Sequence, residues 1–295
     1  MNNSTAIYGK RIRISDIFLK GLIYVSAVFS VFLLFGIVAY VFVRGIRVIN
    51  WTFLTSVQSS SKGTFGILGN IINTLYLIVI TLLCATPIGI GAAIYLSEYA
   101  KKGKIVTLIE STTEILAGLP SILFGLFGLA FFGTTLKLGY SILTGAFTMT
   151  LMILPLITRN TQEALKTVPA TYRSGALGMG ATKWYMIRTI LLPSAMPGII
   201  TGIILAVGRI VGESAALLFT AGSGYLLPTF GTYGSGLFKK VLEPGGTLTI
   251  QLYLCMSKGQ YDNAFGIAIV LIIIVLLINL LTKYLSKRLD VNRRN

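Results

Sequence analysis

The chain has 295 residues, of which 54% are apolar and 12% charged, and its mean hydropathy is +0.82. Soluble domains carry about 25% charged residues, so this composition excludes an ordinary soluble enzyme and a disordered chain, and indicates a polytopic membrane protein. The net charge is +16 and histidine is absent, which excludes histidine general bases, Ser-His-Asp and Cys-His nucleophiles and histidine-ligated zinc. Two cysteines, Cys84 and Cys255, are too few for a cysteine-rich metal site or a disulfide framework, and no metal or cofactor is expected.

Apolar runs of bilayer length predict six spanning helices and therefore an all-α membrane protein. A spanning helix needs about 20 mostly apolar residues. The first run is too long for the apolar region of a signal peptide, and no small-residue cleavage site follows it, so we interpret it as a retained signal anchor. The six spans are expected near residues 21–43, 68–96, 115–136, 138–158, 197–219 and 263–282.

Basic residues are distributed unevenly between the two sides of these spans. Seventeen of the 25 lie in the N-terminal segment 1–20, in the loops after the second and fourth spans, and beyond the sixth span, where a basic tail covers 286–295. Seven lie on the other side, and Arg209 lies within a span. Because cytoplasmic segments are enriched in Lys and Arg, we predict that both termini are cytoplasmic and that residues 21–285 form one membrane domain. Most of the positive charge thus reflects topology, and no nucleic-acid partner is expected.

The long segment 222–261 lies between the last two spans, on the side opposite the termini. It is rich in glycine and contains Pro228 and Pro244. Its length leaves room for a short external helix or for a re-entrant helix, and the sequence does not distinguish the two.

The cytoplasmic loop 163–193 carries the strongest motif. After the tripeptide 174–176 come three residues, Gly180, nine residues and then an Ile-Leu-Leu-Pro sequence ending at Pro193. This spacing resembles the EAA loop of ABC-importer permeases, whose pattern is Glu-Ala-Ala, three residues, Gly, nine residues and Ile-x-Leu-Pro. The positions that match are Ala176, Gly180, Ile190, Leu192 and Pro193, whereas Ser174 and Gly175 depart from the Glu and the first Ala.

A short helix followed by a glycine turn can dock in a groove on a partner ATPase. Pro169 and Thr171 offer a helix start, Gly180 suits a left-handed turn, and Pro193 suits the start of the next membrane helix. The alternative is an amphipathic helix lying on lipid headgroups, held by Lys183, Trp184 and Arg188; the full spacing favours docking. The residues predicted to couple to the ATPase are Arg173, Ser174, Gly175, Ala176, Leu177, Gly180, Ala181, Thr182 and Lys183.

No phosphate-binding P-loop is present. Gly9-Lys10 and Gly103-Lys104 are followed by residues other than Ser or Thr, so neither completes the motif. We expect the energy for transport to come from a partner ATPase, or from an ion gradient if the resemblance does not hold.

The fifth span contains two charged residues. Arg209 and Glu213 are four residues apart, which places them on one face of a continuous helix. A charge in mid-bilayer costs about 2.5–3.5 kcal/mol on insertion scales. The pair therefore either lines an anion path or neutralises itself and pins the span to a neighbour, and the sequence leaves both open. Arg159, at the end of the fourth span, is a second path candidate or a topological anchor.

Four glycines of the fifth span form two small-x-x-x-small pairs, which favour close helix packing. They are Gly198, Gly202, Gly208 and Gly212. The packing partner is either a second permease subunit or a helix of the same bundle, and the spacing does not decide between them.

Several segments resemble the Pst-type phosphate permeases more closely than other importers. They are PIGIGAAIYLSEYA at 87–100, LAGLPSILFGLFG at 116–128, GATKW at 180–184 within the loop, and LAVGRIVGES at 205–214. The resemblance is to the PstA type, since the external loop after the first span is short compared with the PstC type. It maps the family's intramembrane charges onto Arg209, Glu213 and Arg159. The predicted substrate path is Arg159, Arg209, Glu213 and Ser214.

The resemblance implies a MetI-like type I ABC importer permease in the plasma membrane of a prokaryote, crossing it several times. Its implied partners are a homologous PstC-type permease, a PstB-type ATPase dimer and a PstS-type extracytoplasmic phosphate-binding protein, and it is not itself an enzyme. The alternatives are an importer of another oxyanion (phosphonate, sulfate or molybdate), a secondary transporter or channel, and a membrane enzyme.

Overall fold

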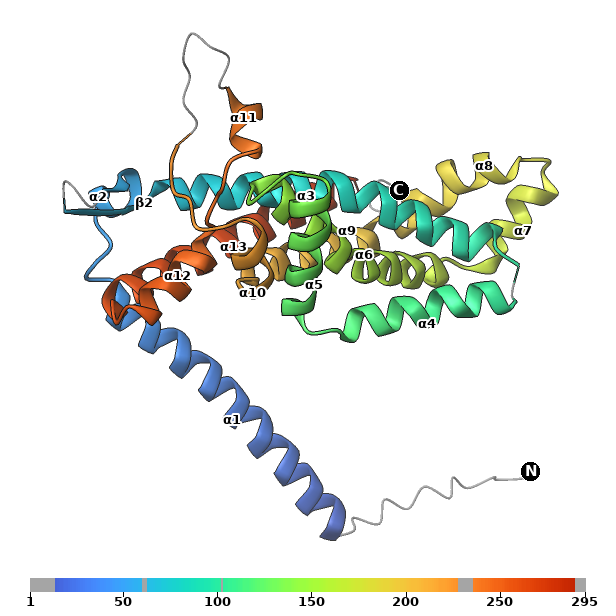
Figure 1. Ribbon diagram of the computed structural model, residues 1–295. Coiled ribbons are helices and arrows are strands. Elements are labelled where there is room, and N and C mark those ends of the chain that lie inside the picture. The colour runs from blue at the N-terminus through green and yellow to red at the C-terminus, as the bar shows by residue number, and fades with distance from the viewer. Residues whose placement is uncertain (1–13, 60–62, 102, 228–235, 290–295) are drawn as a thin grey trace.

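A computed structural model of the chain describes residues 14–59, 63–101, 103–227 and 236–289 (Figure 1). The first 13 residues of the expected N-terminal segment 1–20, with Gly9-Lys10, and the part of the tail 286–295 from residue 290 lie outside them. The elements are α1 (Ile14–Gly45), α2 (Trp51–Thr55), β1 (Val57–Ser59), β2 (Thr64–Ile67), α3 (Leu68–Ile94), the π-helical turn η1 (Tyr95–Tyr99), α4 (Lys104–Gly118), α5 (Ser121–Gly128), η2 (Leu129–Thr135), α6 (Ile142–Thr167), α7 (Ala170–Gly178), α8 (Lys183–Met186), η3 (Ile187–Leu191), α9 (Leu192–Gly212), α10 (Ala215–Thr220), α11 (Leu237–Val241), α12 (Leu248–Ser257) and α13 (Tyr261–Leu289).

The predicted all-α membrane fold is confirmed. Among the described residues, five helices are long and apolar enough to cross a bilayer, and a bent pair adds a sixth span if it is counted as one. A two-stranded antiparallel hairpin of β1 and β2, unexpected from the sequence, follows α2. The long helices are Phe18–Gly45, Leu68–Tyr99, Ile142–Thr167, Lys183–Gly212 and Tyr261–Tyr284, and the bent pair is Lys104–Gly118 with Ser121–Thr135.

Helix α6 forms the centre of the bundle and packs most closely against α3 and α9. Its face toward these helices contains small and polar residues, so the backbones approach closely. The hydroxyl of Thr148 donates to the Thr144 carbonyl at 2.8 Å. That of Thr150 donates to Ala146 at 2.8 Å. These bonds let α6 bury the hydroxyls of Thr148 and Thr150 without leaving them unpaired.

The glycines of α9 divide into two pairs. A β-carbon added at Gly198 or Gly202 would lie 2.6 Å or 2.7 Å, respectively, from a side chain of α6, whereas one at Gly208 or Gly212 would have nothing within 4 Å. The first pair therefore serves packing within this chain. The second pair lies on an open face of α9.

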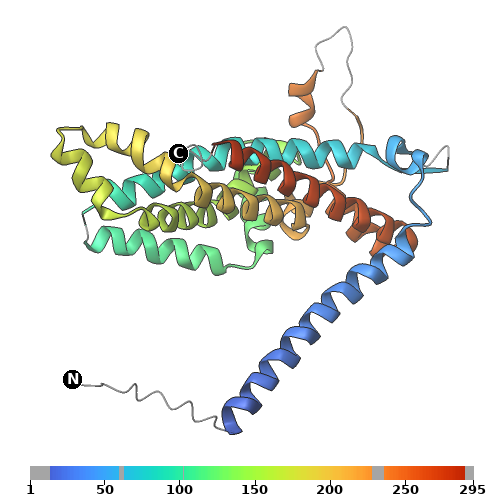
Figure 2. The same ribbon diagram turned by 180° about the vertical axis from the view of Figure 1, so that it is seen from behind.

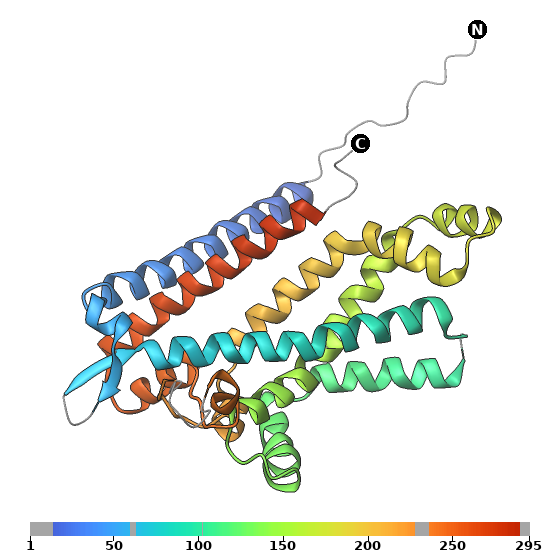
Figure 3. The same cartoon turned by 90° about the horizontal axis from the view of Figure 1, so that it is seen from above.

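Helix α1 leaves the bundle, as Figures 1 and 2 show. It meets α13 near its C-terminal end, where the Tyr40 and Phe265 rings lie 5.6 Å apart and Gly45 is buried against the Phe265 backbone. In Figure 3 α1 and α13 run from the end of the molecule that carries α2 and α12 toward the end that carries α7 and α8. The first residues of α1 and the last of α13 thus lie toward the same end.

The third span differs from the single helix expected over 115–136. The structure has α4, which begins at Lys104, and then α5, and the two meet at 101°. The break follows from Pro120, which has no N–H to donate and forces the preceding residue out of the helical region; Leu119 is accordingly extended. Two glutamates before the expected start, Glu110 and Glu114, therefore lie within α4.

The fifth span also differs from the expected 197–219. The chain is helical from Lys183 through η3 into α9, and α9 ends at Gly212. Glu213 is extended, with ψ of 124°, and α10 begins only at Ala215. The expectation that Arg209 and Glu213 share one helical face is therefore wrong.

The segment 222–261 contains two short helices, α11 and α12, in its described part. Helix α12 packs against α13 and α3. Asn73 Nδ2 donates to the carbonyls of Gly224 at 3.0 Å and Gly246 at 3.3 Å, and Thr74 Oγ1 accepts from the Leu248 N–H at 3.0 Å. These bonds fasten the glycine-rich segment to the start of α3.

Candidate functional site

The coupling loop is a helix, a tight turn and a second helix. Helix α7 ends at Gly178, and Gly180 has φ of +82°, the left-handed conformation expected for it. The Ala181 N–H donates to the Ala176 carbonyl at 3.1 Å, which closes the turn. Thr182 then caps α8, its hydroxyl accepting the Tyr185 N–H at 3.3 Å. The loop therefore has the shape of a rigid hairpin of helices.

The two faces of α7 differ in what they touch. Arg173 and Ala176, three residues apart, face the bundle, and Ala176 is buried in an apolar cluster with α6, α8 and η3. Ser174 and Leu177 are exposed on the other face. Met179, between the helices, is 91% exposed. The remaining predicted coupling residues Gly175, Gly180, Thr182 and Lys183 are exposed, and Ala181 is half-buried.

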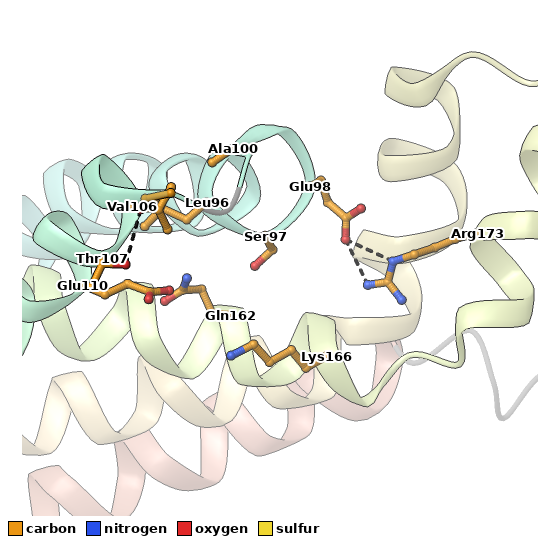
Figure 4. A pocket seen from close by; sticks show the side chains of 11 residues that line it. Leu96, Ser97, Glu98, Ala100, Val106, Thr107, Glu110, Gln162, Lys166 and Arg173 are labelled. Atoms are coloured by element: carbon orange, nitrogen blue, oxygen red, sulfur yellow. Dashed lines mark hydrogen bonds and ion pairs between the residues drawn. The ribbon is translucent and has the colours of Figure 1, made fainter.

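Arg173 is bound within the chain. Its guanidinium donates to Glu98 Oε1 from Nε at 3.1 Å and from Nη2 at 2.9 Å (Figure 4). It also donates to the carbonyls of Leu165 and Val168, both at 2.9 Å. Lys183, another predicted coupling residue, lies over the ring of Tyr99, 4.8 Å from its centroid. Sequence reasoning missed Glu98 and Tyr99, because nothing in their spacing relates them to a loop 75 residues later.

A polar groove runs between α4 and α6, and it is called the α4–α6 groove below. It consists of three hollows of about 590, 200 and 290 Å³, each sharing lining residues with the next. The first lies against η1 and Arg173 (Figure 4), and the third reaches α9. The charged residues that line the groove are Glu98, Glu110, Glu114, Arg159, Glu163, Lys166, Arg173 and Arg209.

Two of the four predicted path residues meet in the third hollow. Arg159, from α6, and Arg209, from α9, both line it. Arg159 pairs with Glu114 at 3.2 Å and with Glu163 at 3.5 Å, and all three side chains are exposed. Arg209 is also exposed, and within the described part of the chain it makes no ion pair or side-chain hydrogen bond. The hollow thus holds one arginine neutralised by carboxylates and one that is available to an anion.

The other two predicted path residues do not line this groove. Glu213 Oε1 accepts the Ala216 N–H at 3.1 Å and so begins α10, and Ser214 precedes that helix. The sequence reasoning also missed Gln162, Glu163 and Lys166, which lie on the face of α6 that Arg159 shares. Their spacing from Arg159 would have shown this if the fourth helix had been extended past residue 158.

Comparisons with known proteins agree with this architecture. Residues 85–295 match the family described as binding-protein-dependent transport system inner membrane component. The chain is 34% identical over 283 residues to the probable ABC transporter permease protein YqgI of Bacillus subtilis, which covers 93% of this chain and 96% of that protein. It is 33% identical over 265 residues to the phosphate transport system permease protein PstA 2 of Mycobacterium bovis, covering 88% and 83%.

A solved structure has the same fold. The bacterial alginate ABC transporter in complex with an alginate-bound periplasmic protein contains a chain that matches with a TM-score of 0.69 at 16% identity, covering 94% of this chain and 96% of that one. The chain therefore crosses the plasma membrane several times as a permease subunit, and ATP hydrolysis belongs to a separate subunit. The helical spans, the family match and these relatives together show that the chain belongs to the binding-protein-dependent transport system inner membrane components, the MetI-type permeases of ABC importers.

Proposed function

We propose that the substrate of this importer is inorganic phosphate and that the chain is its PstA-type permease. The partners would be a homologous PstC-type permease, a PstB-type ATPase dimer and a PstS-type binding protein. One observation carries the proposal: Arg159 and Arg209 line a single hollow of about 290 Å³. Guanidinium groups bind oxyanions through paired donors, and the PstA 2 relative is named for phosphate transport.

The groove favours passage over retention. Glu110, Glu114 and Glu163 line it beside the cations, and like charge repels a passing oxyanion. Arg159 is held by two of these carboxylates, so a phosphate must compete with them for its donors. Contacts in the path are therefore weak and transient, as a conduit requires.

The exposed end of the coupling loop is the proposed ATPase contact. Leu177 and Met179 are exposed, and nothing in the described part of the chain covers them fully. Apolar anchors of this kind fill grooves on partners. The loop, the start of α1 and the end of α13 lie toward one end in Figure 3. This supports a cytoplasmic position for the loop and for both termini, in accord with the basic segments.

Transport by the assembled complex in proteoliposomes tests the substrate. Arg209→Gln should lower phosphate uptake by about tenfold, the loss expected for one charged hydrogen bond. Lys258→Gln, an exposed cation outside the groove, is the matched control and should transport normally. Competition by sulfate, molybdate and phosphonate identifies the anion. Uptake by the chain alone, insensitive to ATP, would contradict the proposal.

A second measurement tests the ATPase contact. Met179→Asp should abolish co-purification of the ATPase because the exposed methionine would no longer fit an apolar groove. Met256→Asp changes an exposed methionine of α12, at the opposite end of the molecule; it is the control and should retain the ATPase. Normal ATPase recovery with Met179→Asp would place the contact elsewhere.

A further inference from the structure

The coupling loop is fastened at two points to the end of the second span. Arg173 on α7 binds Glu98 of η1 through two nitrogens, at 2.9 and 3.1 Å. Lys183 at the start of α8 lies over the ring of Tyr99, the next residue of η1. Because η1 continues α3 without a break, both helices of the loop are attached to one spanning helix.

Arg173 also holds the end of α6. Its Nη2 donates to the Leu165 carbonyl and its Nη1 to the Val168 carbonyl, each at 2.9 Å. These carbonyls belong to the last turn of α6 and the residue after it, where backbone acceptors lack helical partners. One guanidinium therefore joins α3, α6 and α7, and its planar fork makes these bonds in a way that a lysine could not reproduce.

The arrangement is sheltered from solvent. The Glu98 side chain is 7% exposed and that of Arg173 is 25% exposed, so water and salt screen this pair less than the exposed pairs of Arg159. Apolar packing continues the attachment, since Ala176, Met186 and Ile187 form a cluster against which Ile90 and Ile94 of α3 pack. The inner face of the loop is thus committed to contacts within this chain.

We infer that Glu98 and Arg173 are positioning residues that transmit movement of the coupling helix to the spans α3 and α6, and that Arg173 is not a contact to the ATPase. Their role rests on the proposed function of α7 as the ATPase-bound element. The outer face of α7 receives the movement, and the Glu98–Arg173 pair makes α7, α3 and α6 move as one body. Lys183 and Tyr99 form the second attachment.

Coupling in the reconstituted transporter tests this inference. Glu98→Gln, Arg173→Gln and the double variant should each keep ATPase co-purification and ATP hydrolysis, while substrate carried per ATP falls by about tenfold, an ordinary coupling energy. The double variant should be no worse than either single one, because the pair acts as a unit. Arg188→Gln removes an exposed cation from η3 and is the matched control, with unchanged coupling. Arg173→Lys should also keep hydrolysis, and it should restore only part of the coupling.

Spin labels give a readout that needs no transported anion. In the complex with Cys84 and Cys255 replaced by alanine, labels are attached at exposed Ser174 on α7 and exposed Leu83 on α3. Their distance should be the same without nucleotide and with bound ATP, and Glu98→Gln should make it change between the two states. This arm reports on the attachment even if the carried anion is not phosphate, and Met179→Asp reports separately on whether α7 contacts the ATPase.

Two results would overturn the inference. One is loss of ATPase co-purification in Arg173→Gln but not in Glu98→Gln, which would make Arg173 a partner contact. The other is a nucleotide-driven change of the Ser174–Leu83 distance in the unaltered pair, which would mean that α7 moves independently of α3.

Discussion

Helices α1 and α6 are both long and apolar, yet they are buried to opposite degrees. The most apolar window of α1 has a mean hydropathy of 2.5 and none of it is buried within this chain, whereas the window of α6 has a mean hydropathy of 1.5 and is 67% buried. In a soluble protein the more apolar helix would be the buried one. Here the order is reversed because lipid is as apolar as leucine, so close packing and polar contacts draw helices together.

The side chains of the two helices show how this works. Helix α1 presents large apolar residues such as Phe32 and Leu34 outward. Helix α6 turns Thr144, Thr148 and Ala146 inward, toward its neighbours. At the centre of the bundle, small and hydroxyl-bearing residues thus lie beside buried large ones such as Met149 and Ile153, whereas the large side chains of α1 face outward.

The largest difference should appear when a large side chain is added at a packed position beside α6 and, for comparison, at an open position on α1. Gly202→Leu would force a side chain into α6, since a β-carbon there already lies 2.7 Å from Asn160 Cβ. Overpacking costs about 1–3 kcal/mol, which lowers the thermal midpoint by about 2–4 °C for each kcal/mol. Gly36→Leu on α1, where nothing lies within 4 Å, should leave it unchanged. Equal midpoints of the two purified variants would show that the bundle is not packed around α6.

Removing a polar group should have an intermediate effect. Asn73→Ala deletes a donor to the Gly224 and Gly246 carbonyls. These carbonyls still accept from the Gly246 N–H and from Asn70 Nδ2, so the expected cost is that of a lost hydrogen bond, about 0.5–1.5 kcal/mol. The segment after α10 should then become open to protease. Ser30→Ala on α1 is the control, since its hydroxyl donates to Ser26 in an exposed turn, and its digestion pattern should match the parent chain. Unchanged digestion of Asn73→Ala would mean that the segment is held by other contacts.

The smallest effect should come from the exposed charges of α6. This substitution tests whether the stability loss depends on burial of the side chain or on the helix that carries it. Glu163→Gln removes a pair with Arg159 that spans 3.5 Å between exposed side chains. Such pairs contribute about 0–1 kcal/mol, so the thermal midpoint should move little and the difference should disappear in high salt. If Glu163→Gln lowered the stability as much as Asn73→Ala does, and the loss persisted in high salt, the charges of the α4–α6 groove would be essential to the structure.

The positions of most spans follow from the lengths of the apolar runs. The breaks within spans could not be predicted, because they depend on single residues. The expected spans 68–96 and 263–282 lie within α3 with η1 and within α13, because no charge falls inside those ranges. The sequence reasoning missed the break before α5, since Pro120 can kink or end a helix and only the surroundings decide which. It also carried the fifth span through Gly212, because an isolated glycine in a helical pattern can be tolerated or can end the helix.

The coupling loop shows the same division. The left-handed turn at Gly180 was predictable because few residues other than glycine adopt it readily. The inward direction of Arg173 was not, since its partner Glu98 lies 75 residues earlier. Neighbouring residues determine local conformation. Whether a cation binds within the chain or faces a partner depends on which distant acceptor the fold brings near it.

The contact of α1 with α13 has a consequence for biosynthesis. The main partner of the earliest described helix is the latest one, so α1 enters the membrane long before the surface it rests on exists. Contacts between segments so far apart in the chain form late. We therefore expect α1 to remain unattached until translation has delivered α13, so that docking of these two helices completes folding of the subunit.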